Sequence, residues 1–464
     1  MTGAAQPRHG IDLLLKRVGD WLMRHQAAIK RGQWLVVSVY LVLVAVPAFL
    51  PMPPKTAHLW NNLTLFAQFA FWGIWWPFVL LSMILVGRLW CGLLCPEGAL
   101  SEFASAHGKA HAVPHWITWR GWPFVAFAAT TIYGQMVSVY QYAGPVLLIL
   151  GGSTVGAIVV GYLYGRNKRV WCRYLCPVNG VFGLLAKLAP VHFAVDPEAW
   201  RAWPKHRGAR AATMNCAPLV PVRTMQGNSM CHMCGRCSGF RDAVTLSRRS
   251  PNFEIVHVAG NDPKPVETLL IVFGLIGIAF GAFHWSSSAL YVDVKQFLAE
   301  WLVDHDLTWP LAPIAPWWIL TNYPDQNDML TPLDGAVLLA DIFTVALTLG
   351  GFVMLCLAGT TLALDRWSTP RLHHLAQALI PIAGCGVFLG LSALTVTMLR
   401  GEGLALDFVN PLRASLLVGA GLWSLSLVWQ ISALYAPSPA RRLIAMVPFS
   451  LAVLASCGSW ATLF

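Results

Sequence analysis

Residues 89–100 read LWCGLLCPEGAL and residues 170–181 read VWCRYLCPVNGV, so one pattern occurs twice, 81 residues apart. Each stretch closes an apolar run, holds two cysteines four residues apart and places a proline directly after the second cysteine. Proline has no backbone N–H with which to continue a helix, so the chain is expected to turn away there. The repeat therefore predicts two pairs of thiols at the ends of two apolar helices.

The composition indicates a membrane protein. Of the 464 residues, 56% are hydrophobic and only 11% are charged, whereas a soluble globular chain carries about 25% charged residues. A run of about 20 apolar residues is long enough to cross a bilayer as a helix. We expect an all-α polytopic fold with about nine transmembrane helices, at residues 34–50, 64–87, 121–142, 145–165, 266–286, 336–363, 375–399, 413–436 and 443–462.

The distribution of positive charge predicts the orientation. Loops rich in Lys and Arg stay on the cytoplasmic side. With the N-terminus in the cytoplasm, 28 of the 32 Lys and Arg residues fall on that side, and the C-terminus lies outside. The outer side then keeps only Lys55, Lys295, Arg400 and Arg413. The net charge of +11 thus reflects membrane orientation, and we expect membrane lipid and no nucleic acid as a partner.

The apolar runs divide the chain into four parts. Residues 1–33 form a basic N-terminal segment for the membrane interface, residues 34–190 a four-helix core with both cysteine repeats, and residues 191–265 a polar cytoplasmic insert. Residues 266–464 add five helices and an acidic outer loop at 287–335. One helical face of the N-terminal segment is apolar and suits a lipid surface, at Ile11, Leu14, Leu15, Val18, Trp21 and Leu22.

The insert contains the most specific motif, MCHMCGRC at residues 230–237. Cys231, Cys234 and Cys237 follow the C-x2-C-x2-C spacing with which ferredoxins bind three corners of a 4Fe–4S cube, and a remote cysteine completes the set. Cys216, in NCAPL, is the candidate within the insert. A four-cysteine zinc site is the alternative, although such sites more often use two separated C-x2-C pairs. The triplet predicts a small ferredoxin-like iron–sulfur insert.

The two repeats supply four more thiols for a second cluster. Cys91 with Cys95, and Cys172 with Cys176, stand at i and i+4, so each pair shares a face if its helix continues. Arginines recur beside them, where positive charge would offset an anionic cluster and raise its potential. We therefore predict two 4Fe–4S clusters, with inert thiols at two helix ends as the alternative. The predicted cluster-tuning residues are Arg88, Arg169 and Arg173.

The paired C-x3-C-P repeats, followed by a ferredoxin-type triplet, resemble the NapH/NosR/CcoG-type membrane polyferredoxins over residues 30–250. The resemblance implies a bacterial inner-membrane protein that passes electrons through 4Fe–4S clusters, often between the quinol pool and a periplasmic enzyme or metal. Family members usually carry two full C-x2-C-x2-C-x3-C-P motifs. This chain has one triplet, and Ser238 instead of C-P follows Cys237, so its insert is expected to hold one cluster.

In length and architecture the chain is most similar to FtrD, the polyferredoxin component of bacterial ferrous-iron uptake systems. That resemblance implies an iron permease, a periplasmic iron-binding protein and a cupredoxin-like protein as partners. The expected function is a relay between a periplasmic partner and the quinone pool or the cytoplasmic side, without substrate chemistry of its own. The alternatives are a quinol dehydrogenase-type subunit feeding a periplasmic reductase, and a transport scaffold that holds structural zinc.

The acidic outer loop allows a functional and a structural interpretation. The outer loop 287–335 holds seven acids against one lysine, which suits a basic partner or a cation or reflects only the orientation rule. Its candidate residues are Asp304, Asp306, Asp325 and Asp328.

Asp341 lies inside an apolar run, where a charge is costly and often functional, or it simply ends a helix. His107, His111 and His115 are expected in a plain basic loop, and Cys356, Cys385 and Cys457 as small hydrophobes.

Overall fold

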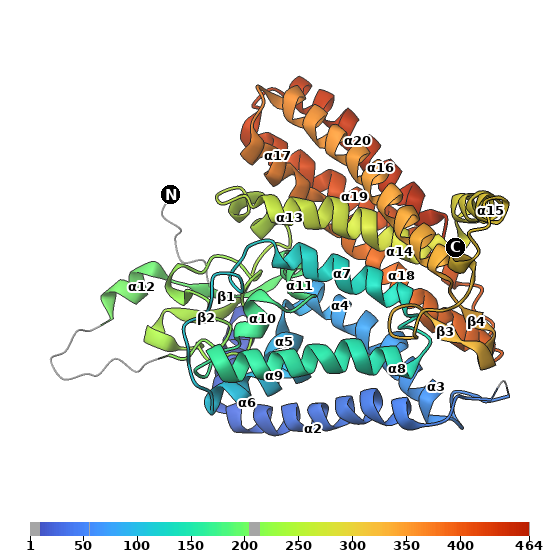
Figure 1. The fold of residues 1–464 in the computed structure, drawn as a ribbon. Helices are drawn as coiled ribbons and strands as arrows, with labels where there is room; N and C mark the ends of the chain where they lie inside the picture. The colour runs from blue at the N-terminus through green and yellow to red at the C-terminus, as the bar shows by residue number, and fades with distance from the viewer. Residues whose placement is uncertain (1–9, 55, 204–213, 464) are drawn as a thin grey trace. The chain divides into compact units, whose positions relative to one another are not determined.

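The computed structural model describes residues 10–54, 56–203 and 214–463, and their secondary structure is predominantly helical (Figure 1). The strands in these ranges form two short antiparallel pairs, β1 with β2 and β3 with β4. The predicted all-α fold is confirmed. The chain forms two compact units: the described parts of Met1–Leu41, Val79–Arg120 and Ser153–Asn261 make unit 1, and those of Val42–Phe78, Gly121–Gly152 and Asp262–Phe464 make unit 2.

Unit 1 contains both cysteine repeats and the insert. Three helices, α2, α4 and α9, contribute residues to both units. The elements of unit 1 are α1 (Gly10–Arg24), α2 (Gln26–Ala45), α4 (Trp76–Val86), α5 (Leu89–Leu93), α6 (Pro96–Ala106), α9 (Gly152–Tyr164), α10 (Val170–Tyr174), α11 (Asn179–Leu185), β1 (Val191–Val195), α12 (Pro197–Ala202) and β2 (Val244–Arg248).

Unit 2 is a bundle of long helices, some of which are continued by π-helical turns such as η2 (Phe69–Trp75) and η8 (Leu270–Ile278). Its other elements are α3 (Leu63–Gln68), α7 (Trp122–Met136), α8 (Ala143–Val146), α13 (Pro265–Leu269), α14 (Ala279–His284), α15 (Ala289–Asp304), β3 (Asn322–Tyr323), β4 (Asp328–Met329), α16 (Pro332–Leu364), α17 (Thr369–Ala376), α18 (Ile380–Gly401), α19 (Val409–Tyr435) and α20 (Pro439–Ala461).

Eight helical stretches in the described part of the chain are long and apolar enough to cross a membrane, one fewer than the nine predicted. They are Gln26–Phe49, Leu63–Val86, Ala143–Tyr164, Pro265–Ser287, Pro332–Leu364, Thr369–Gly401, Val409–Tyr435 and Pro439–Ala461.

The difference lies in α7, which corresponds to the predicted span 121–142 but has only 15 residues. It stops at Met136 because the next residues turn sharply: Ser138 has a φ of +50°, and Thr321 binds the Met136 carbonyl through its backbone N–H at 2.8 Å. The helix still follows the span Pro265–Ser287 along its length. Phe127 lies beside Gly274, and Trp285 Nε1 donates to Gln135 Oε1 at 3.1 Å. The two helices therefore run parallel, as the nine-helix topology requires.

The predicted N-terminal amphipathic helix is present as α1, but its apolar face is divided. Leu22 is buried against the insert, where it lies beside Gly235, and Leu15 packs against the apolar core of the insert. The other four apolar residues are exposed and remain available to lipid: Ile11, Leu14, Val18 and Trp21.

The insert is closed by one strand pair. β1 and β2 pair antiparallel from Val191 opposite Arg248 to Val195 opposite Val244. The polypeptide between them carries all four cysteines of the insert, and its described part packs on Phe193 and Leu246. The strand pair thus brings together the two ends of the 48-residue segment that carries these cysteines.

Candidate iron–sulfur sites

The two cysteine repeats adopt the same local structure. In each, a five-residue helix begins at residue 89 or 170 and ends two residues before the second cysteine. The backbone N–H of Cys95 donates to Trp90 O at 2.9 Å, and that of Cys176 donates to Trp171 O at 3.0 Å. The helix therefore does not continue through the second cysteine. The two thiols of each repeat do not share one helical face, in contrast to the arrangement expected for a continuous helix.

Proline explains this difference. The residue before a proline is disfavoured in the helical region, and Cys95 is extended, with φ −64° and ψ 119°. It becomes the N-cap of α6: its Sγ accepts a hydrogen bond from Gly98 N at 3.4 Å. Each repeat thus presents its first thiol from a helix and its second from the turn that follows.

The fold of unit 1 brings the four thiols of the repeats together. Burial raises the pKa of the Cys172 thiol to about 12, and nearby Glu97 and Cys91 add to the effect, which Arg169 opposes. Burial also raises the pKa of Cys95, with Cys172 and Cys91 as the next contributors. The pKa of Cys176 rises for the same reasons. Thiols whose pKa values are raised in this way ionise only against a strong positive charge, which a metal centre would supply.

The four cysteines of the insert line a pocket, whose walls also include Phe193, Val222 and His232. Burial raises the pKa of Cys231 to about 12, and it raises the pKa values of Cys216 and Cys237 as well. The pocket is thus lined by sulfur. The cysteines that line it are Cys216, Cys231, Cys234 and Cys237.

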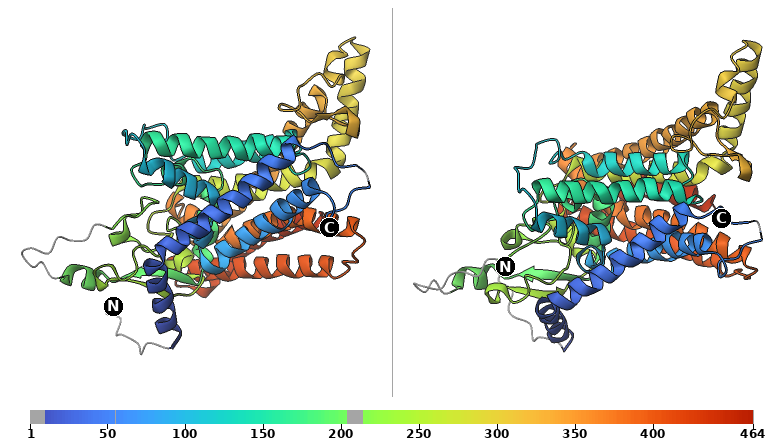
Figure 2. Two further views of the ribbon diagram at one scale, coloured as in Figure 1. Left: turned by 90° about the horizontal axis from the view of Figure 1, so that it is seen from below. Right: turned by 60° about the horizontal axis from the view of Figure 1, so that its bottom comes forward.

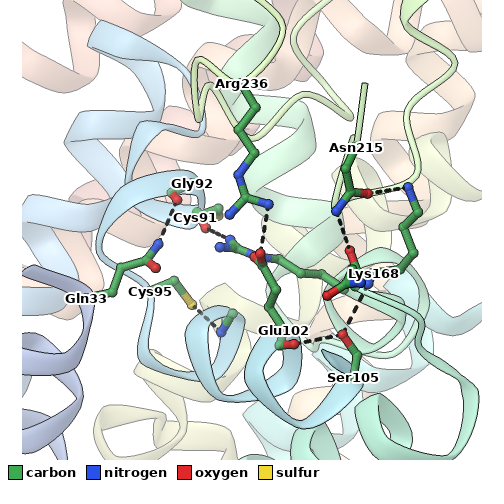
Figure 3. Close-up of polar contacts among 12 residues, drawn as sticks. Gln33, Cys91, Gly92, Cys95, Glu102, Ser105, Lys168, Asn215 and Arg236 are labelled. Atoms are coloured by element: carbon green, nitrogen blue, oxygen red, sulfur yellow. Dashed lines mark hydrogen bonds and ion pairs between the residues drawn. The ribbon is translucent and has the colours of Figure 1, made fainter. Parts of the chain in front are cut away.

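Cys216 reaches this pocket because the turn before α10 holds its segment in place. Lys168 Nζ donates to Cys216 O at 3.0 Å and to Asn215 Oδ1 at 2.6 Å. The backbone N–H of Arg169 donates to Ala217 O at 2.8 Å. Figure 3 shows Lys168 and Asn215 facing each other next to the first repeat. The residues just before the second repeat therefore position Cys216, the predicted fourth ligand of the insert, beside the triplet.

The described residues offer no site for a single metal ion made of three or more His, Cys, Asp or Glu side chains. A 4Fe–4S cube binds each of its thiolates at a different iron atom, so its ligands stand further apart than those of one ion.

Buried arginines surround both groups. Arg169 is 1% exposed; its Nε lies 2.8 Å from Glu102 Oε2, and its Nη1 donates to Cys91 O at 2.5 Å. Arg236 holds the other oxygen of Glu102, with Nη1 2.7 Å from Oε1 (Figure 3). Arg88 donates to Ser229 O at 2.9 Å. Arg169 Nη2 and Arg88 Nε are buried with no hydrogen-bond partner in the part of the chain that is described, and these donors would suit an anionic cluster.

Arg173, the third predicted tuning residue, makes a different contact: its guanidinium lies 5.9 Å from the centre of the Tyr174 ring. All three arginines act on His232, which is buried within the triplet. Burial first, and then Arg88, Arg169 and Arg173, hold the pKa of His232 well below its ordinary value. His232 is therefore neutral and adds no charge to the site.

The two groups meet at Gly92. A Cβ atom placed on Gly92 would lie 2.0 Å from His232 O and 3.0 Å from Cys234 N, so only glycine allows this approach. Gln33 Nε2 donates to Gly92 O at 3.0 Å, and Gln26 Nε2 donates to Cys234 O at 3.0 Å. The helical segment 26–33 thus fastens both ligand loops to each other. We call the Gly92–His232–Cys234 contact the seam.

Comparison with known protein families agrees with this geometry. A family model described as "4Fe-4S binding domain" matches residues 68–112 and 147–195. In these two segments the chain is similar to the 4Fe-4S binding domain. The two matched segments each hold one C-x3-C-P repeat and the helix before it, so the match agrees with the predicted 4Fe–4S chemistry, and the ligand assignment stays a prediction.

Three curated proteins are similar to the chain. "Putative electron transport protein YccM" of Escherichia coli K12 is 26% identical over 240 residues, covering 45% of this chain and 65% of that protein. "Protein NirI" of Paracoccus denitrificans is 30% identical over 134 residues, and "Regulatory protein NosR" of Pseudomonas aeruginosa is 28% identical over 135 residues. These two matches cover 24% and 25% of this chain and 19% of each relative. No solved structure matches.

The chain thus spans about two thirds of the first relative and a fifth of the other two. The predicted resemblance to membrane polyferredoxin-type electron transport proteins is confirmed by these relatives. The narrower resemblance to the ferrous-iron uptake component stays a prediction.

Several residues of the site have no signal in the sequence. Glu102 and Gly92 lie near a repeat but have no counterpart in the other one, since the equivalent positions are Gly183 and Arg173. Only the tertiary contacts show that Glu102 bridges two arginines. Gln33 is the last residue of the basic segment 1–33, directly before the first apolar run, and its position in the sequence does not indicate that its amide is buried.

The outer acidic residues are not equivalent. Asp304, Asp306 and Asp325 are exposed, whereas Asp328 accepts a hydrogen bond from Tyr142 OH at 2.7 Å and so helps to fold the loop. Asp341 is 4% exposed, and Ser288 Oγ donates to its Oδ1 at 2.9 Å. His107 to His115 do not form a helix: α6 ends at Ala106, so the expected plain loop is confirmed.

Proposed function

We propose that this chain is a membrane electron-transfer subunit whose unit 1 carries two 4Fe–4S clusters side by side. The observation that carries the proposal is the gathering of eight cysteines into two buried groups that meet at the seam. One group is Cys91, Cys95, Cys172 and Cys176; the other is Cys216, Cys231, Cys234 and Cys237. Such a cluster, when bound, accepts and releases one electron at a time.

The protein residues in this proposal hold and tune the clusters. Buried thiols exclude water, and the desolvated arginines supply positive charge that favours the reduced, more negative state. Glu102 holds Arg169 and Arg236 in place and balances part of their charge, because a buried cation without a partner is expensive. The neutral His232 lets the two loops approach without adding charge.

We further propose that the protein lies in the bacterial inner membrane with a cytoplasmic N-terminus and a periplasmic C-terminus. The Lys and Arg distribution supports this orientation. The parallel packing of α7 on Pro265–Ser287 supports an odd number of crossings, because it lets α7 take the place of the ninth helix. Both clusters then lie on the reducing side, where thiols remain free.

In this setting the chain relays electrons between a periplasmic partner and the quinone pool or the cytoplasmic side. The name of the first relative, an electron transport protein, supports a relay in general. Participation in ferrous-iron uptake, with a permease and a cupredoxin-like or iron-binding partner, rests on the resemblance in architecture. A quinol dehydrogenase-type subunit that feeds a periplasmic reductase is the alternative.

Iron and acid-labile sulfide measured on anaerobically purified protein test the proposal. About eight iron atoms per chain are expected from two four-iron clusters. Cys234→Ala should remove about half of this iron and leave the cluster of the repeats, and Cys95→Ala should remove the other half. Cys457→Ala, at a lone thiol in α20, is the matched control and should retain all of it. Zinc in place of iron and sulfide would establish the scaffold alternative.

A further inference from the structure

The outer loop is not a solvated acidic loop throughout. Its first half forms α15, a helix of 16 residues, which at 1.5 Å per residue is about 24 Å long. In Figure 1 α15 is seen end-on, whereas α13 and α16 run lengthwise across the view. Figure 2 shows the same steep angle, with one end of α15 standing clear of its neighbours.

Contacts with other residues of unit 2 hold α15 in place. Tyr291 OH donates to Asp334 Oδ1 at 2.9 Å, and Lys295 Nζ lies 2.5 Å from the same oxygen. Val294, Leu298 and Leu302 pack against the apolar core formed with α16. One face of α15 is therefore covered by the rest of unit 2, and these contacts set the direction of the helix.

A second apolar line remains uncovered. Leu290, Phe297 and Trp301 share one side of the helix, and their exposed fractions are 50%, 67% and 46%. The residues three positions further on, Asp293, Glu300 and Asp304, form a parallel line of carboxylates. α15 thus keeps an exposed apolar line with an aromatic pair beside a line of carboxylates, and Val292 and Val303 are exposed on the far side of the carboxylates.

The depth of α15 follows from its connections. Ser288, its N-cap, comes directly after the span that ends at Ser287, and α16 begins the next span at Pro332. A helix that starts at the end of one span and lies across it occupies the boundary between hydrocarbon and water. Tryptophan is enriched at that boundary, and the rest of the loop exposes Trp309 and Trp318 as well.

We propose that α15 lies in the membrane interface, with Phe297 and Trp301 inserted among the phospholipids of the leaflet that faces this loop. An amphipathic helix in this position buries its apolar side at the headgroup boundary. Its carboxylate line then faces water, because negative charge is unfavourable in the acyl region. The lipid surface thereby sets the direction in which Asp304 is presented to any soluble partner.

Photocrosslinking tests this placement. p-Azidophenylalanine replaces Phe297, Trp301 or, as the control on the carboxylate line, Glu300, in full-length protein reconstituted into liposomes that contain an alkyne-tagged phosphatidylcholine. We expect lipid adducts at positions 297 and 301 at several-fold the yield at 300. The exposed position 297 tolerates an aromatic of nearly the same shape, and position 301 provides an independent readout.

Equal lipid yields at 297, 301 and 300 would overturn the proposal, because the helix would then have no lipid-facing side. A protein adduct at 297 in native membranes, in place of a lipid adduct, would also overturn it by showing that a partner covers this line. The same samples retain their iron in either case, so the outcome is independent of the cluster assignment.

Discussion

Replacing Gly92 by alanine tests whether the two ligand loops depend on direct contact. The added Cβ would lie 2.0 Å from His232 O, whereas ordinary contact begins at 3.4 Å, so the loops must separate by about 1.4 Å. Such overpacking typically costs 1–3 kcal/mol, partly offset by about 0.5–1 kcal/mol because alanine stabilises a helix relative to glycine. Gly32→Ala is the matched control, since nothing lies within 4 Å of its Cβ position.

Both variants are purified anaerobically, assayed for iron, and examined by thermal unfolding and by electron paramagnetic resonance after reduction. We expect Gly92→Ala to retain iron in both groups but to unfold at lower temperature and to show weaker magnetic interaction between the clusters. Gly32→Ala should match the wild type in iron content and spectrum. An unchanged spectrum and unchanged stability in Gly92→Ala would refute the seam as a tight contact, whatever the iron content.

Three further outcomes follow from the structure. Arg169→Met should lower the reduction potential of at least one cluster, because it removes a buried positive charge that favours the reduced state. The control Arg223→Met, at an exposed arginine, should leave both potentials unchanged. Equal potentials for Arg169→Met and the wild type in a redox titration would contradict the role of Arg169. A membrane-impermeant thiol reagent added to intact cells should fail to label Cys231, and labelling from outside would reverse the proposed orientation. Neutralising the exposed outer acids should slow partner-driven electron transfer at low salt, with the difference shrinking as salt rises, and a rate independent of salt would leave these acids without a partner role. The acids to replace together by Asn are Asp304, Asp306 and Asp325.

Much of the architecture is readable from composition and periodicity. Membrane helices satisfy their backbone internally and must be apolar over about 20 residues, so eight of the nine predicted spans correspond to long helices. The ninth, α7, is shorter because the turn at Ser138 is held by the backbone of Thr321. That contact joins segments about 180 residues apart, and no local sequence pattern predicts it.

Within the site, the sequence by itself determined the kinds of ligands and their local geometry. The prolines after Cys95 and Cys176 require a turn wherever the chain is placed, because a proline restricts the residue before it. The C-x2-C-x2-C spacing likewise brings three thiols together within one short loop. These are local properties of the backbone, which act over a few residues.

Only the tertiary structure decided how these parts combine. Lys168 and Arg169 position the segment of Cys216, Glu102 bridges Arg169 and Arg236, and the missing side chain of Gly92 lets the two loops touch. Each of these contacts joins residues tens to more than a hundred positions apart, where sequence spacing carries no information about distance. Their formation depends on the packing of whole helices and on the desolvation of charge, which a local pattern of residues does not encode.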